Sequence, residues 1–170
     1  GGGNGGAGGT GGKQFSDCGN IDNGGRGGKS LAYSNISNKI FMGGSGGSGH
    51  ANSPGGYISN GGHGGGIVIL QSDFIKSNAH TISSNGNNFQ PANAPDPITD
   101  GHDGKGGGGA GGTVLAGINT YLDAAQINVK GGNGGSITET GMARIGGGGG
   151  GGGGVAWFKQ STLPANVTAS

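Results

Sequence analysis

The chain has 170 residues, enough for one domain, and 50 of them are glycine, roughly 29% against a usual share of about 7%. Leu, Ile, Val and Phe together contribute only 28 residues, too few for the core of a Rossmann, TIM-barrel or helix-bundle domain. The formal net charge is +1, with 10% charged residues, which excludes a basic surface for nucleic acid and argues against a self-repelling disordered chain.

Two further features limit the class of protein. The single cysteine, Cys18, permits neither an intramolecular disulfide nor a cysteine-based zinc site. No run of 18 apolar residues and no basic-then-apolar leader occurs, so we predict no membrane insertion. We interpret the chain as a segment of a larger protein.

Glycine is arranged with a period of three. Residues 2–13 are four Gly-Gly-x triplets, and similar triplets return at 24–29, 43–48, 61–66, 106–113 and 131–136, before nine consecutive glycines at 146–154. Three residues per turn is the period of an extended polyproline II helix. Two glycine faces per turn let neighbouring backbones approach and pair their N–H and C=O groups, so the triplets predict a bundle of polyglycine II helices.

Short apolar segments alternate with these runs. In chain order, strands are predicted at 31–33, 39–42, 67–70, 81–84, 114–116, 126–129 and 155–158, separated by Gly/Asn turns. Glycine-to-strand junctions recur about every 40 residues, which is a repeat signal. We expect burial of the apolar residues Ile67, Ile69, Val114, Ile118, Ile127, Val129 and Trp157 between stacked units.

The predicted fold class is therefore all-β: a repetitive short-strand array resembling a β-solenoid or β-sandwich, with polyglycine II helices and essentially no α-helix. Residues 1–170 form one domain, with units at about 24–60, 61–105, 106–145 and 146–170. The third places of the triplets are expected on the surface, where aromatic side chains would join them. These residues are Asn4, Thr10, Lys13, Arg26, Lys29, Ser45, His63 and Asn133, with Tyr33, Tyr57, Tyr121 and Trp157. For Trp157, burial in its apolar strand is the preferred interpretation.

The stretch 88–105 departs from the repeat, carries Pro91, Pro95 and Pro97, and is predicted to be a loop on one face. It holds Asp96, Asp100, His102, Asp103 and Lys105, of which the three aspartates are the candidate calcium ligands. Their spacing matches neither an EF-hand nor a calcium-binding nonapeptide repeat, so a solvated turn-forming loop is the plainer interpretation.

Other chemistry has little support in the sequence. His50, His63, His80 and His102 lack the paired spacing of metal sites, and Cys18 has no basic neighbour to activate it. The Gly-x-Gly patterns at 25–29 and 104–109 precede no predicted helix and lack a P-loop signature. We predict no catalytic residues, no cofactor and no enzyme activity.

The succession 64–70 (GGGIVIL), 81–86 (TISSNG), 106–115 (GGGGAGGTVL) and 127–135, followed by polyglycine and 155–158 (VAWF), resembles the glycine-rich repeat region of Bacteroidota cell-surface proteins. Such gliding-motility-associated proteins are exported by the type IX secretion system. The resemblance covers about residues 61–168. It implies an extracellular, cell-surface location, with the outer-membrane translocon and its shuttle barrel as partners during export.

The expected function is therefore a structural or adhesive module of a secreted surface protein, acting in adhesion or gliding motility. Surface glycans or other surface proteins are the candidate ligands. The alternative is a receptor-binding tip adhesin of a phage tail fibre, in which polyglycine II bundles carry variable loops.

Overall fold

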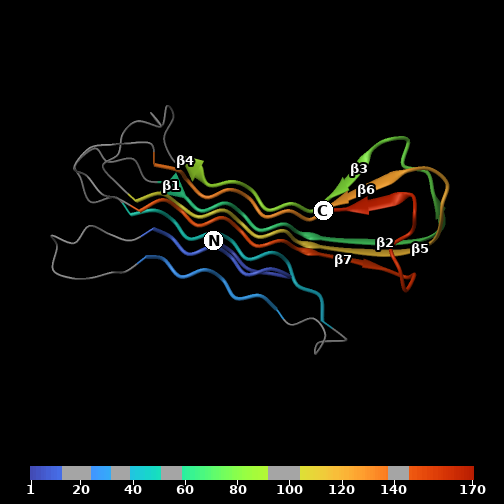
Figure 1. Ribbon diagram of the computed structural model, residues 1–170, viewed down its shortest axis with the longest axis horizontal. Coiled ribbons are helices and arrows are strands. Elements are labelled where there is room, and N and C mark those ends of the chain that lie inside the picture. Colours follow the sequence, from blue (N-terminus) through green and yellow to red (C-terminus); the bar gives the residue numbers. More distant parts are fainter. Residues whose placement is uncertain (13–23, 32–38, 51–58, 92–103, 138–145) are drawn as a thin grey trace.

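The computed structural model describes residues 1–12, 24–31, 39–50, 59–91, 104–137 and 146–170. They form an elongated body in which glycine-rich segments run side by side along most of the length and the longer strands gather at one end (Figure 1). These residues contain no helix, so the predicted helix-free, all-β class is confirmed.

Two three-stranded parallel sheets make up the strand end. One sheet has the order β2 (Ile67–Ile75), β5 (Thr113–Tyr121), β7 (Val155–Phe158). The other has the order β3 (Thr81–Ser83), β6 (Ala125–Asn128), β8 (Val167–Ala169). A short antiparallel pair, β1 (Ser59–Asn60) with β4 (Gln90–Pro91), lies at the other end of the bundle.

The connectivity is repetitive. A glycine segment enters a strand of the first sheet, the chain turns, and the next strand joins the second sheet before leading into another glycine segment or, after β8, ending at Ser170. Each unit therefore adds one strand to each sheet in parallel register, as Ile67 pairs with Thr113 and Thr113 with Val155. The sheets are small and open at their edges. A closed solenoid is not present in the described residues.

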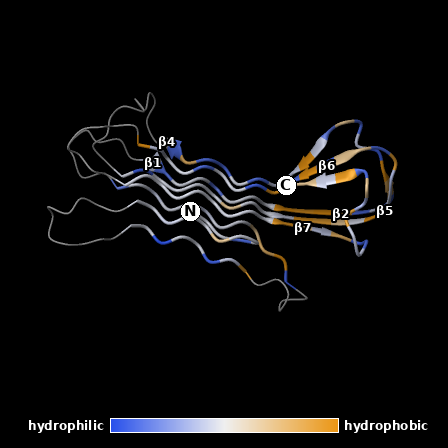
Figure 2. Ribbon diagram, in the orientation of Figure 1, coloured by the Kyte–Doolittle hydropathy of each residue, from blue (hydrophilic) through white to orange (hydrophobic). Residues whose placement is uncertain are grey.

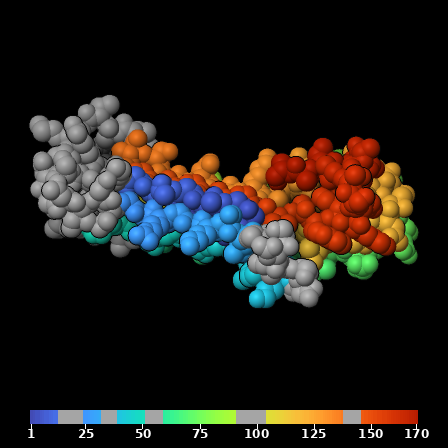
Figure 3. Space-filling view, turned by 60° about the horizontal axis from the view of Figure 1, so that its bottom comes forward, coloured from blue at the N-terminus to red at the C-terminus, as the bar shows by residue number. Residues whose placement is uncertain are grey.

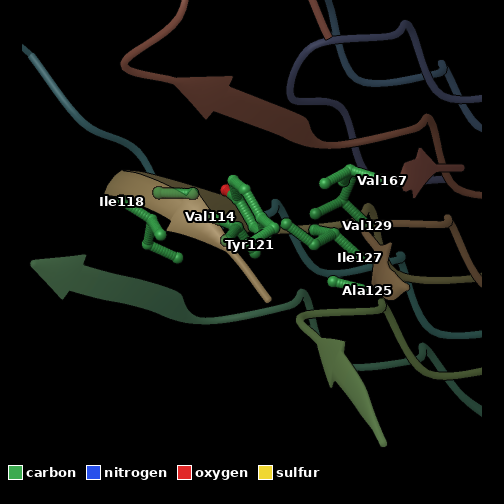
Figure 4. Close-up of a cluster of buried hydrophobic side chains, with 8 residues drawn as sticks. Val114, Ile118, Tyr121, Ala125, Ile127, Val129 and Val167 are labelled. Carbon is green, nitrogen blue, oxygen red and sulfur yellow. The ribbon is translucent and has the colours of Figure 1, made fainter. Parts of the chain in front are cut away.

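The apolar core lies between the two sheets. Val114, Ile118, Ile127 and Val129 are buried there, as predicted, together with Ala116, Tyr121, Ala125 and Val167 (Figure 4). Hydropathy confirms this division of the molecule, because apolar residues concentrate in the strands while the glycine segments are nearly neutral (Figure 2). The side-chain core is thus confined to one end.

Three residues predicted to be buried lie on the surface instead. Ile67, Ile69 and Trp157 are 41%, 63% and 54% exposed. Side chains alternate between the faces of a strand, and in these strands Val68 and Leu70 take the inner face. The prediction was wrong because both faces of these strands are apolar.

Cohesion in the glycine bundle comes from the main chain. Hydrogen bonds link different segments at three-residue intervals, as where Gly6, Gly9 and Gly12 donate to the carbonyls of Gly153, Gly150 and Gly147. This interval matches the period of the triplets and the three residues per turn of an extended helix. The N-terminal segments lie along one side of the resulting rod (Figure 3).

The segment 104–112 lies at the centre of the bundle. It is hydrogen-bonded to six surrounding segments, and residues 106–112 are all buried. Every N–H from Gly107 to Gly112 donates to a neighbouring segment. The six neighbours are 1–3, 43–50, 59–66, 84–89, 129–137 and 146–154.

Close approach explains why the buried part of this segment, residues 106–112, is glycine apart from Ala110. A Cβ on Gly108, Gly109 or Gly111 would overlap a carbonyl group of the adjacent segment. None of the described glycines has φ in the left-handed region, so space rather than backbone conformation requires glycine here.

Candidate functional site

One end of the bundle is where most of the chain connections leave the described body. Gly12 donates to Gly147, Gly49 to Ser59, and Lys105 to Gly146, so chain ends from five segments meet there. These ends border four of the five segments outside the described residues. The four are 13–23, 51–58, 92–103 and 138–145.

The described residues at this end are held in place by polar contacts. Ser59 is buried, and its Oγ accepts a hydrogen bond of 2.7 Å from the Gly106 N–H. His50 pairs with Gly104 in an isolated antiparallel bridge, and the β1–β4 pair adds a second link. We call this closely hydrogen-bonded end of the bundle, whose residues border the four segments, the connection end.

The sequence of these four segments is distinctive in charge. They contain six of the eight acidic residues but only two basic ones, Lys13 and Arg144. The acidic residues are Asp17, Asp22, Asp96, Asp100, Asp103 and Glu139. The candidate calcium ligands Asp96, Asp100 and Asp103 therefore lie outside the described residues, as do His102, Cys18, Tyr33, Tyr57 and Lys13.

The other histidines are not brought together. His50 is at the connection end, His63 is an exposed third place on a glycine segment, and His80 follows the turn after β2. Within the described ranges, no group of three His, Cys, Asp or Glu side chains is close enough to hold a metal ion.

Most of the third places that were predicted to be exposed are exposed, namely Thr10, Arg26, Lys29, Ser45, His63 and Asn133. Asn4 is the exception, because it is fully buried and its Nδ2 donates to the Gly111 carbonyl at 2.7 Å. Three residues earlier on the same central segment, Gly108 accepts from the backbone N–H of Gly2. Because the chain turns at Asn4, the side-chain amide of this residue takes the place of the backbone N–H that would otherwise bond to the Gly111 carbonyl.

Tyr121 also departs from expectation. It was predicted to join an aromatic surface, but it is 8% exposed and belongs to the core. Burial raises the pKa of its hydroxyl, which has no hydrogen-bond partner among the described residues. Tyr121 is therefore not available to a ligand.

The outward face of the β2-β5-β7 sheet is a second surface of interest. Ile69, Leu115 and Trp157 are register partners and form one apolar row across it. Thr113 begins the face, and its hydroxyl donates to the Phe41 carbonyl, so the segment around Phe41 borders the row on the bundle side.

Polar groups follow on the same face, beyond the apolar row. Asn119 donates to Asp73 at 2.8 Å and accepts from the Lys159 ammonium, so one hydrogen-bonded line crosses the sheet. The Gln71 side chain lies over Gly117, where a Cβ would collide with its amide oxygen. We call the row and this polar line together the outer sheet face. Strand alternation did not indicate this face, because residues 67–70 and 155–158 are apolar on both sides of the strand.

Hydrogen bonds to the Asp123 side chain hold together the turns at the strand end. The Asp123 carboxylate accepts from the backbone N–H groups of Ser77 and Asn78, at 2.7 and 2.8 Å, and from the Ser77 hydroxyl. These hydrogen bonds, the Ser77 N–H first, together with the nearby charge of Lys76, outweigh partial desolvation and lower the pKa of Asp123 below its ordinary value. These hydrogen bonds join the turn after β2 to the turn after β5, which belong to two successive units.

Comparison with protein-family models, with curated proteins and with solved structures gives no match. In the part of the chain that the structure describes, no helix has the length and apolar character needed to cross a membrane.

Proposed function

We propose that this chain is an adhesive module in which a rigid glycine bundle presents four chain segments at its connection end to a partner. The observation that carries the proposal is the convergence of the bordering residues, which hydrogen bonds hold together across separate segments. Recognition by loops on a rigid scaffold is a common arrangement in binding proteins. The acidic balance of the four segments favours a partner surface with positive charge.

Segment replacement tests this function. Segments 92–103 and 138–145 would each be replaced by a short Gly-Ser linker, and adhesion of protein-coated beads to candidate cell surfaces would be counted. We expect adhesion to fall while the unfolding midpoint stays unchanged, because the described hydrogen bonds of the bundle are all made by other residues.

The matched control replaces 32–38 in the same way. Leu31, which borders that segment, donates to the Asn4 carbonyl, and the Asn4 side chain bonds to Gly111 close to the start of β5, so this border lies at the strand-facing end of the bundle. Equal loss of adhesion with this control, or full adhesion after both replacements, would contradict the proposal.

The surface location and export by the type IX translocon with its shuttle barrel are part of this proposal and are supported by the sequence resemblance alone. In a full-length protein, further units added at the open edges of the two sheets would give the predicted solenoid array. Sequence beyond Ser170 in the parent gene tests this: a sorting domain of roughly 100 residues supports it.

A phage tail-fibre tip adhesin is the second candidate. The gathering of four connections at one end favours it, because a tip adhesin needs its recognition segments at a single extremity. A parent gene beside tail-fibre genes, with relatives that differ mainly within the four segments, would favour this candidate over the bacterial surface protein.

A further inference from the structure

We propose that the outer sheet face binds a neutral glycan, with Trp157 as the stacking platform and the Lys159–Asn119–Asp73 line as the hydrogen-bonding rim. This site lies at the strand end of the molecule, whereas the proposed adhesive function places recognition at the connection end. The two sites can therefore fail or succeed independently.

The chemistry of the face is divided into two bands. Trp157 and Ile69 supply an exposed apolar row, with Leu115 partly exposed between them. A sugar ring has the matching division, since its C–H groups pack on an aromatic side chain while its hydroxyls reach donors and acceptors beside it. Both bands lie on the same face of the sheet.

The polar line is already ordered by its own contacts. Asn119 is fixed between Asp73, 2.8 Å from its Nδ2, and the ammonium of Lys159. Prior ordering reduces the entropy lost when a ligand binds. One carboxylate and one ammonium balance each other, so the line carries no net charge and favours a neutral ligand over an anionic one.

The size of the face decides between a glycan and a second copy of the chain. Three strands at about 4.8 Å spacing, over six residues at about 3.3 Å rise, cover roughly 300 Å². A stable protein–protein interface needs about 800 Å² from each partner. Association through this face alone would also remove water from Asp73 and Lys159, at an energetic cost. A ligand of a few sugar rings fits the area better.

Trp157 is the only tryptophan in the chain, so its fluorescence reports on this face directly. The intact protein would be applied to an array of neutral and acidic oligosaccharides, and the best-binding neutral oligosaccharide would then be titrated. We expect a blue-shifted Trp157 emission and reduced quenching by acrylamide upon binding.

Variants separate this site from general effects on folding. Trp157→Ala is expected to weaken binding at least about tenfold, and Asn119→Ala, which retains the fluorescent reporter, about threefold to tenfold. The matched control is Leu122→Ala, at an exposed apolar residue in the turn after β5, outside the face; it should bind as the unaltered protein does. Should Trp157→Ala fail to fold, Asn119→Ala alone tests the rim.

Three results would overturn the proposal. One is an array without any neutral-glycan signal. Another is glycan binding that Asn119→Ala leaves unchanged. The third is a blue shift that depends on protein concentration without glycan, with dimers in sedimentation, because this would assign the face to a second copy.

Discussion

The packing of the central segment predicts a sharp contrast between two Gly→Ala substitutions. In Gly108→Ala, the new Cβ would lie 2.1 Å from the Gly132 carbonyl oxygen, whereas real Cβ atoms essentially never approach closer than 3.0 Å. The backbone would have to move by about 1 Å, and neighbours on all sides leave it no free direction. In Gly47→Ala, the Cβ would meet nothing within 4 Å.

The expected magnitudes follow from these contacts. Overpacking costs about 1–3 kcal/mol, and distortion of the bonds from Gly108 to Gly149 and from Gly2 to Gly108 adds about 1 kcal/mol each. Gly108→Ala should therefore lose about 3–5 kcal/mol of unfolding free energy. Gly47→Ala should gain about 0.4–1 kcal/mol, because alanine restricts the unfolded chain.

Denaturant unfolding followed by circular dichroism and by Trp157 emission measures both variants. A Gly108→Ala protein too unstable to fold agrees with the prediction if Gly47→Ala is at least as stable as the unaltered protein. Unfolding free energies within about 0.5 kcal/mol of each other would refute the claim that close backbone approach, rather than composition, dictates glycine in the bundle.

Three further substitutions test the strand end. Ala79 has φ of 63° in the left-handed region, so Ala79→Gly should raise the unfolding free energy by about 1 kcal/mol; a loss would show that this turn is not strained. The lowered pKa of Asp123 means that its hydrogen bonds stabilise the fold above the ordinary value of 3.8 and are lost as pH falls through the folded pKa. The stability difference between the unaltered protein and Asp123→Asn should then be constant above about pH 5 and shrink below pH 3.8 in urea titrations; a difference unaffected by acid would contradict this. Because the buried Tyr121 hydroxyl has no partner within the described residues, Tyr121→Phe should leave the unfolding free energy unchanged or raise it by up to about 1 kcal/mol in thermal unfolding. A large decrease in the unfolding free energy would show that the hydroxyl makes a hydrogen bond after all.

The sequence was most informative where a period was present. Gly-Gly-x triplets predicted extended segments with outward third places, and the strand at 155–158 was predicted with its observed bounds. The strand predicted at 126–129 matches β6 to within one residue at each end, whereas the prediction at 114–116 covered only the first part of the nine-residue β5. These predictions succeeded because local spacing alone determines which residues can lie against a neighbour.

Features that depend on distant neighbours could not be predicted. Residues 39–42 were predicted as a strand, but no strand ladder forms there, and Phe41 instead accepts a bond from the Thr113 hydroxyl. In β7 all four residues are apolar, so nothing in the sequence indicated that Trp157 faces outward. Asn4 looked like another surface residue because its role depends on a carbonyl 107 positions away.

The main-chain cohesion of the bundle has a consequence for temperature. Exposure of apolar surface raises the heat capacity on unfolding, and exposure of polar surface lowers it. A body held together largely by N–H and C=O pairs between glycines exposes mostly polar surface when it unfolds. Globular domains have a heat-capacity change on unfolding of about 12–15 cal/mol/K per residue, and the value for this protein should be lower. Its unfolding free energy should therefore vary unusually little with temperature. Cooling, which weakens apolar cores, would lower the unfolding free energy of this rod only slightly.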